Sequence, residues 1–218
     1  MNIGVLGSGD VGKRLGAGFV SIGHKVKIAS RDPQSEKVRA WLAANGKNAS
    51  SGTSAEAAQF GEAIVLATSW DGTQAALQSA GPDNCKGKTV IDVTNPLVFS
   101  DDGPGLALGH TDSGGEQVQR WLPSAHVVKA FNIVGNQLMV HPDLGPCGPP
   151  DMFYCGNDDA AKKQVEGFLK QFGWSTFDIG GIEGARLLEP MCILWVRYAM
   201  ITGGRLHAFK MLRKASDS

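Results

Sequence analysis

The sequence predicts an α/β fold, a doubly wound and mostly parallel sheet followed by a C-terminal helical extension. Two observations along the 218 residues predict the sheet. Short apolar runs alternate with helical patterns, and this alternation requires β-α-β units whose parallel strands are covered by helices on both faces. The first apolar run also leads into a glycine-rich turn. Beyond Gly184 the pattern is purely helical, which predicts the extension.

The first strand and the turn after it carry the clearest motif. The run MNIGVL is apolar enough for a strand buried on both faces, and Gly7, Gly9 and Gly12 then match G-x-G-x-x-G. This motif alone is weak, but here Leu15 and Phe19 continue it at helical spacing. The first glycine permits a tight turn, the second lets a pyrophosphate approach the backbone, and the helix N-terminus offers free N–H groups to that anion. The segment therefore predicts a Rossmann-type dinucleotide site.

The remaining strands are expected where apolar runs recur, at 25–30, 63–68, 89–94, 127–132, 152–156 and 175–180. Helix starts are expected between them. Asp32 and Pro33 are interpreted as an N-cap followed by proline at the first helical position, and SGGE at 113–116 fits a capping box. Asn157 is interpreted as the cap of a later helix that Gly173 ends.

Two longer segments, residues 97–112 and 141–151, interrupt the alternation and are expected to be loops. Loops of this length in compact domains are usually functional or disordered. In an open α/β sheet, ligands bind beyond the carboxyl ends of the strands, which is where both segments would emerge. We therefore interpret them as walls of a substrate site, with plain surface insertions as the alternative.

The chain is expected to divide into a Rossmann-type dinucleotide-binding domain, residues 1–183, and a C-terminal helical segment, residues 184–218. The segment carries an apolar stripe made of Leu187, Leu188, Met191, Leu194, Trp195 and Tyr198. Pro190 predicts an early kink or restart of the helix. The stripe is wider than one helix face normally exposes, so it can dock on its own sheet or on a second subunit. We expect it to contribute to a homodimer contact.

The composition excludes several classes of function. Lys plus Arg and Asp plus Glu both number 21, so the formal net charge is zero, and no basic block offers a surface for nucleic acid. No apolar run is long enough to cross a bilayer, and the chain enters its first strand without a signal peptide, so we expect a cytoplasmic protein without membrane contact. The 4 cysteines and 5 histidines show no metal-ligand spacing, and no metal site is expected.

The end of the second strand indicates which dinucleotide binds. An acidic residue at this position would bind the ribose hydroxyls of NAD, whereas Ser30 and Arg31 occupy it here. A hydroxyl and a guanidinium can hydrogen-bond a 2′-phosphate that a carboxylate would repel. Asp32 is the alternative ribose ligand, but before Pro33 it is more simply interpreted as a helix cap. The sequence therefore favours NADP(H).

Several longer motifs together resemble one known family. They include IGVLGSGDVGKRLG, GHKVKIASR, VIDVTNP, SGGEQVQRWLPSAHVVKAFN and GGIEGARLLEPM. Over at least residues 1–195 the chain resembles the NADPH-dependent F420 reductases, the F420:NADP oxidoreductases. It is similar also to the cytosolic NADPH reductase domain of the six-transmembrane metalloreductases. The resemblance implies hydride transfer between NADP(H) and a small-molecule redox cofactor, either F420 or a flavin such as FMN or FAD.

The resemblance also implies the residues of the cofactor site. It implies pyrophosphate contacts from Gly7, Ser8, Gly9, Asp10, Val11 and Gly12, and 2′-phosphate contacts from Ser30 and Arg31. It places Ala67, Thr68 and Ser69 along the adenosine and ribose, Asn95 and Pro96 at the turn after the fourth strand, and Ala130, Phe131 and Asn132 near the nicotinamide. The loops at 98–112 and 141–151 depart from the family pattern, so the acceptor stays open.

No catalytic side chain is expected. The strand ends that should face the nicotinamide carry small polar residues and the aromatic Phe131, without a histidine or carboxylate suited to proton transfer with a carbonyl. A flat acceptor ring stacked on the nicotinamide needs positioning more than such a group, because the chemistry belongs to the two cofactors. In the loop after the fourth strand, His110 and Ser113 are candidate contacts for the acceptor.

Two other interpretations stay open. A non-catalytic NADP-binding sensor or partner protein would carry the same motifs. An enzyme that reduces an imine or a hydroxy acid would need a substantial helical domain after the sheet. Such an enzyme could use Lys129 as its acid or base, but on a strand Lys129 is more simply interpreted as structural.

Overall fold

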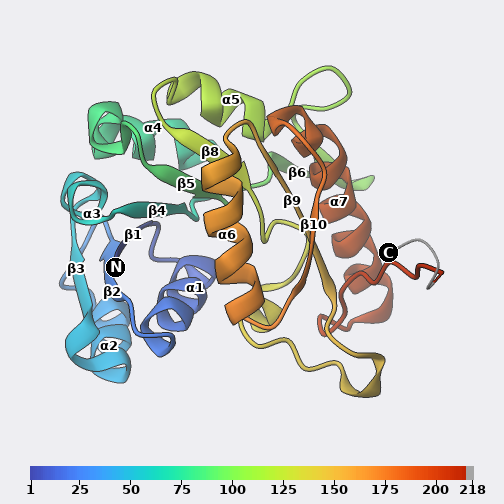
Figure 1. The fold of residues 1–218 in the computed structure, drawn as a ribbon, viewed down its shortest axis with the longest axis horizontal. Coiled ribbons are helices and arrows are strands. Elements are labelled where there is room, and N and C mark those ends of the chain that lie inside the picture. Colours follow the sequence, from blue (N-terminus) through green and yellow to red (C-terminus); the bar gives the residue numbers. More distant parts are fainter. Residues whose placement is uncertain (215–218) are drawn as a thin grey trace.

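A computed structural model describes residues 1–214 and shows an eight-stranded sheet with helices on both faces (Figure 1). The strand order is β10-β9-β8-β5-β4-β1-β2-β3. The strands are β1 (Asn2–Leu6), β2 (Lys25–Ala29), β3 (Ala49–Gly52), β4 (Ala63–Leu66), β5 (Thr89–Asp92), β8 (His126–Lys129), β9 (Asp151–Gly156) and β10 (Ser175–Asp178). Every neighbouring pair is parallel except β8 and β9. The predicted doubly wound, mostly parallel sheet is confirmed.

The helices lie in two layers on this sheet. They are α1 (Asp10–Ser21), α2 (Glu36–Asn45), α3 (Ser54–Phe60), α4 (Trp70–Ala80), α5 (Gly114–Trp121), α6 (Asp159–Gln171) and α7 (Ala185–Thr202). α1 and α6 pack on one face, whereas α3, α4 and α5 pack on the other. α7, the predicted C-terminal helix, lies against α5 and β9 near one edge of the sheet (Figure 1). Among residues 1–214, no helix is long and apolar enough to cross a membrane.

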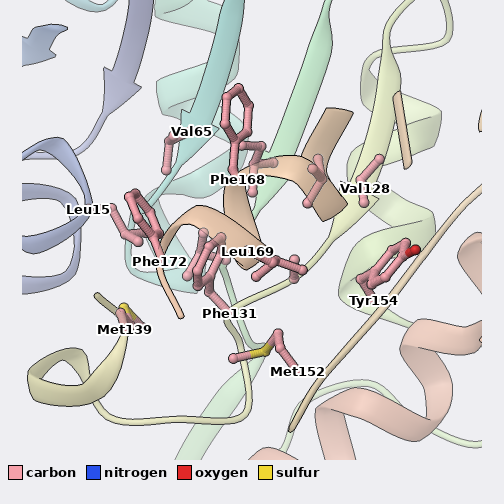
Figure 2. Close-up of a cluster of buried hydrophobic side chains, with 14 of the residues drawn as sticks. Leu15, Val65, Val128, Phe131, Met139, Met152, Tyr154, Phe168, Leu169 and Phe172 are labelled. Carbon is pink, nitrogen blue, oxygen red and sulfur yellow. The ribbon is translucent and has the colours of Figure 1, made fainter. Parts of the chain in front are cut away.

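Neighbouring side chains of one strand enter different cores. On β1, Val5 lies in the core with α1 and α6, while Leu6 lies in the core with α3 and α4. Phe19 of α1 meets Phe168 of α6 edge to face, with the ring centroids 5.0 Å apart. Figure 2 shows Leu15 and Phe168 in this first core. Burial on both faces explains why the central strands are continuous apolar runs.

Two structured regions had no clear signal in the sequence. β3 reads ASSG, and this short polar run does not resemble a strand. The segment 97–112, expected to be a loop, begins with an antiparallel hairpin of β6 (Leu97–Ser100) and β7 (Gly103–Leu106). That expectation is wrong for the first part of the segment, because β7 reads GPGL and its glycines and proline favour a turn. The segment 141–151 contains one short 3₁₀ turn, Gly145–Cys147, and then enters β9.

Two predicted helix caps are wrong. α2 begins after Ser35, which is its N-cap, and not at Asp32 and Pro33. The Asp32 carboxylate instead accepts a hydrogen bond of 3.0 Å from the backbone N–H two residues later, a local turn that Asp favours. The cap of α6 is Asp158, whose carboxylate accepts a backbone N–H of the first turn at 2.8 Å, and not Asn157.

Other helix boundaries follow the sequence. Ser113 is the N-cap of α5, and its hydroxyl accepts the backbone N–H of Glu116 at 3.2 Å. The capping box is only half formed, because the Glu116 carboxylate contacts the Ser113 hydroxyl and the Arg186 guanidinium. Gly173 follows the end of α6 with a φ of +91°, the left-handed conformation that suits a helix stop.

The C-terminal helix runs unbroken through Pro190, so it does not restart there. Residues 203–214 follow it without helix or strand and turn back along it. The indole N–H of Trp195 donates to the backbone carbonyl of His207 at 2.8 Å, and the two rings stack with centroids 4.6 Å apart. Part of the predicted apolar stripe is therefore covered by the chain itself. Residues 215–218 of the expected helical segment lie outside the described residues.

Candidate functional site

The turn between β1 and α1 forms a glycine cradle. Gly7 has a φ of +122°, and a Cβ there would lie 2.4 Å from the carbonyl oxygen of Ala67. A Cβ on Gly12 would lie 2.0 Å from the carbonyl oxygen of Gly7. Gly9 differs, because a Cβ on it would meet no atom within 4 Å, and Gly9 borders a cavity. Two glycines thus close the turn, and the third leaves room for a ligand at the N-terminus of α1, where free N–H groups and the helix dipole favour an anion.

This cavity has a volume of about 510 Å³ and lies at the carboxyl ends of β1, β4 and β5. Its wall is formed by Gly9, Asp10 and Val11 at the start of α1, residues 67–71 after β4, residues 93–95 after β5, and Leu97 and Phe99 of β6. Ligands of open α/β sheets bind beyond these strand ends. The structure therefore brings the glycine turn together with Ala67, Thr68, Ser69 and Asn95, all expected from the sequence.

Ser30 and Arg31 lie at the end of β2, beside the glycine turn. The Ser8 hydroxyl donates to the Ser30 hydroxyl at 3.3 Å, which joins the two segments. Arg31 is exposed and forms no salt bridge within residues 1–214, so its guanidinium is available to an anion. The Asp32 carboxylate is engaged in its own turn with Gln34. This pattern fits a site for a phosphate better than a site for a ribose hydroxyl pair.

At the other end of the cavity, two side-chain amides tie β5 to β8. The Asn95 side-chain amide donates to the backbone carbonyl of Asn132 at 2.9 Å, and the Asn132 side-chain amide donates to Asn95 Oδ1 at 3.0 Å. Asn132 also donates to the carbonyl of Leu188 in α7 at 3.1 Å. The turn after β5, which includes the buried Pro96, is thereby fixed relative to the loop after β8.

The aromatic wall expected from Phe131 is formed by other residues. Phe131 and its neighbour Ala130 are fully buried, and the Phe131 ring lies in the core near Phe172 (Figure 2). Phe131 has a left-handed backbone with a φ of +60°, and it is not among the residues that line the cavity. Trp70 and Phe99 line the cavity instead. The apolar run LVFS could have predicted the strand that carries Phe99. It was not interpreted as a strand because it lies in the segment expected to be a loop.

The structure does not bring His110 and Ser113 into this cavity. His110 lines a different groove of about 770 Å³ between the β7 segment and α7, together with Arg186 and Pro190. Ser113 is fully buried, and its hydroxyl is engaged in capping α5. Within residues 1–214, no group of three or more His, Cys, Asp or Glu side chains is arranged to hold a metal ion.

Two acidic residues, Asp10 and Asp71, line the cavity. Asp10 was expected from the sequence as a pyrophosphate contact, whereas Asp71 was not. Each lies in the first turn of its helix, α1 or α4, and each is exposed. Asp10 also pairs with Lys13 at 3.5 Å. Both acidic residues therefore lie beside helix N-termini and not next to Asn95 and Asn132.

Comparison with known proteins relates this geometry to a family. Residues 2–96 match the family model described as NADP oxidoreductase, coenzyme F420-dependent. A solved structure from Arthrobacter sp. FB24, provisionally named an F420-dependent NADP reductase, is 36% identical, with a TM-score of 0.90 over 97% of this chain and 99% of that chain.

Two curated relatives are matched by this chain over less than two thirds of their own length. The F420-dependent NADP reductase of Methanocaldococcus jannaschii is 31% identical over 144 residues, which are 65% of this chain and 63% of that protein. Metalloreductase STEAP3 of Rattus norvegicus is 27% identical over 190 residues, which are 87% of this chain and 36% of that protein. The Arthrobacter structure, in contrast, is matched over almost its entire length. This chain belongs to the family of F420-dependent NADP oxidoreductases.

Proposed function

We propose that the chain transfers hydride between NADPH and a flat deazaflavin or flavin ring, with F420 as the preferred acceptor. The observation that carries the proposal is one cavity that combines the glycine cradle with an aromatic wall of Trp70 and Phe99. No histidine lines this cavity among the described residues. The family supports NADP(H) as one partner, and the names of two relatives support F420 as the other.

The order of the strands supports one direction for the bound dinucleotide. Ser30 and Arg31 follow β2, the glycine cradle follows β1, and Asn95 follows β5 on the far side of β4. With the pyrophosphate at the N-terminus of α1 and the 2′-phosphate at Arg31, the nicotinamide is directed toward β5 and β8. In this arrangement Thr68 and Ser69 border the middle of the dinucleotide.

The acceptor ring would then lie between the nicotinamide and the hairpin. Phe99 is an apolar residue with 66% of its surface exposed, and it faces the cavity from β6. An aromatic side chain at this position favours a flat conjugated ring, because stacked rings attract each other. When bound, NADPH supplies two electrons and a proton as hydride, and the acceptor takes this hydride together with one proton from water. The protein residues bind and orient the two rings.

The test is NADPH oxidation by the purified chain with F420, FMN and FAD as separate acceptors. We expect turnover, fastest with F420. Phe99→Ala should raise the KM for the acceptor by about 2- to 13-fold, the range for one aromatic pair, and leave the Kd for NADPH unchanged. Val98→Ala is the matched control, since Val98 is the exposed neighbour of Phe99 and does not line the cavity. Tight NADPH binding without turnover of any acceptor would instead favour an NADP-binding sensor.

We also propose that α7 forms a homodimer contact. Trp195 is covered by His207, but Leu187, Leu194 and Ile201 of α7 are 66%, 60% and 72% exposed. A helix that exposes several large apolar residues favours association with a second apolar surface. Symmetric dimers are the commonest soluble homo-oligomers.

A further inference from the structure

A buried ionic cluster lies beneath the nicotinamide end of the cavity, and the proposed reaction does not use it directly. Its members are Lys129 at the end of β8, Asp92 at the end of β5, and Glu189 in α7. Their exposed fractions are 0%, 0% and 1%. The Lys129 ammonium lies 2.7 Å from the Asp92 carboxylate and 3.0 Å from the Glu189 carboxylate. This burial favours the structural interpretation of Lys129 over a role as acid or base.

The cluster holds one residue of the cavity wall through several hydrogen bonds. Lys129 Nζ donates to the backbone carbonyl of Thr94 at 2.8 Å. Asp92 Oδ1 accepts the Thr94 backbone N–H at 2.9 Å and the Thr94 hydroxyl at 2.7 Å. Thr94 lines the cavity next to Asn95. Both members of the ion pair are thus hydrogen-bonded to this turn.

Backbone N–H groups of α5 stabilise the negative charge of Glu189. The Glu189 carboxylate accepts the backbone N–H groups of Gly114 and Gly115, both at 2.9 Å. These N–H groups belong to the first turn of α5, whose dipole favours a negative charge. Burial disfavours a charged Lys129, but Asp92 and Glu189 outweigh it and raise the pKa of Lys129 above its usual value. The ammonium is therefore charged, and it is fully engaged by acceptors.

We propose that Lys129 is a positioning residue, whose ammonium fixes the Thr94 carbonyl and thereby the turn that presents Asn95 to the nicotinamide. Buried ion pairs often contribute little to stability compared with apolar residues of the same volume. The place of the ion pair in the fold therefore says more about its role than its contribution to stability does. Here the Lys129 ammonium, at the end of β8, contacts Asp92 at the end of β5 and the backbone of Thr94 in the cavity wall. The inference rests on the proposed function for the direction of the bound dinucleotide.

The test measures how tightly the Lys129→Met variant binds two ligands of different length. NADPH reaches the nicotinamide end, whereas 2′,5′-ADP carries the 2′-phosphate without the nicotinamide. We expect the Kd for 2′,5′-ADP to be unchanged and the Kd for NADPH to rise about tenfold, as for the loss of one or two hydrogen bonds. With F420 present, the hydride-transfer rate should fall about 100-fold, the effect of a misplacement of about 1 Å.

A charge-balanced double variant separates positioning from stability. Lys129→Met leaves Asp92 and Glu189 as two unpaired charges, and this variant can fail to fold. Adding Asp92→Asn restores the wild-type net charge of the cluster and keeps an oxygen acceptor for Thr94. The proposal expects a folded double variant that still binds NADPH about tenfold more weakly. If the double variant regains both wild-type NADPH affinity and the wild-type transfer rate, Lys129 is only structural and the proposal is overturned.

The two proposals fail in different ways. If the wild-type chain binds NADPH but reduces no acceptor, the proposed reaction is wrong, and the binding comparison still decides the role of Lys129. If the wild-type chain reduces F420 while Lys129→Met weakens NADPH and 2′,5′-ADP equally, the reaction stands and the positioning role is contradicted.

Discussion

Replacing Arg31 by alanine should change the choice between NADPH and NADH. Arg31 is exposed and forms no salt bridge within residues 1–214, so its removal breaks no ion pair in that part of the protein. Its effect should therefore depend on whether the ligand carries a 2′-phosphate. A hydrogen bond between charged groups corresponds to about 10- to 150-fold in affinity. Because Arg31 faces solvent and salt screens it, we expect the lower part of this range at physiological ionic strength.

The assay is a fluorescence titration of NADPH and NADH against the wild type and Arg31→Ala, repeated at low and high salt. The Kd for NADPH should rise, more steeply at low salt, while the Kd for NADH and the melting temperature stay unchanged. Arg39→Ala is the matched control, since it removes the same charge from an exposed position on α2. Equal losses for both nucleotides, or an equal effect of Arg39→Ala, would refute the assignment of Arg31 to the 2′-phosphate.

Three further predictions concern stability, assembly and thiol reactivity. Gly167→Ala in α6 should raise the free energy of unfolding by about 0.5–1 kcal/mol, whereas Gly18→Ala in α1 should lower it by about 1–3 kcal/mol. The added methyl meets nothing within 4 Å at the first site and a valine side chain at 2.5 Å at the second, and denaturant unfolding compares the two. Leu194→Asp should convert the proposed dimer into a monomer in light scattering, and a wild-type monomer at all concentrations would contradict the α7 contact. Burial raises the pKa of the Cys155 thiol to about 12, so under mildly alkaline conditions iodoacetamide should modify the exposed Cys147 and spare Cys155, as read by mass spectrometry.

The central sheet could be predicted because its signals are local. An apolar run such as AIVL at 63–66 is buried on both faces, and the glycine turn sits where the strand-helix pattern requires it. β3 could not be found in the same way, because ASSG is held in the sheet by pairing with β2 and not by its own side chains. The prediction of Asp32 as a helix cap was wrong because Asp favours both helix caps and isolated turns, and the local sequence does not distinguish them.

The glycine turn of the candidate site could be predicted from the sequence, but the walls of its cavity only in part. Gly9 and Arg31 are set by their place after a strand, which sequence patterns give directly. Phe99 and Asp71 enter the cavity through the hairpin and the start of α4, whose positions depend on distant packing. Phe131 was expected at the cavity but points into the core, because a backbone φ of +60° at this residue cannot be inferred from its neighbours in sequence.

The most direct measurement of the central claim is a single-turnover experiment with NADPH deuterated at the transferable position of its nicotinamide. F420 is the acceptor, since its reduced ring keeps the transferred hydrogen on carbon, and mass spectrometry reads the product. The account predicts reduced F420 that carries one deuterium for each NADPH oxidised, at a rate that Phe99→Ala lowers under subsaturating acceptor. Reduced F420 without deuterium, or saturable NADPH binding with no reduction of F420, FMN or FAD, would contradict direct hydride transfer in this cavity.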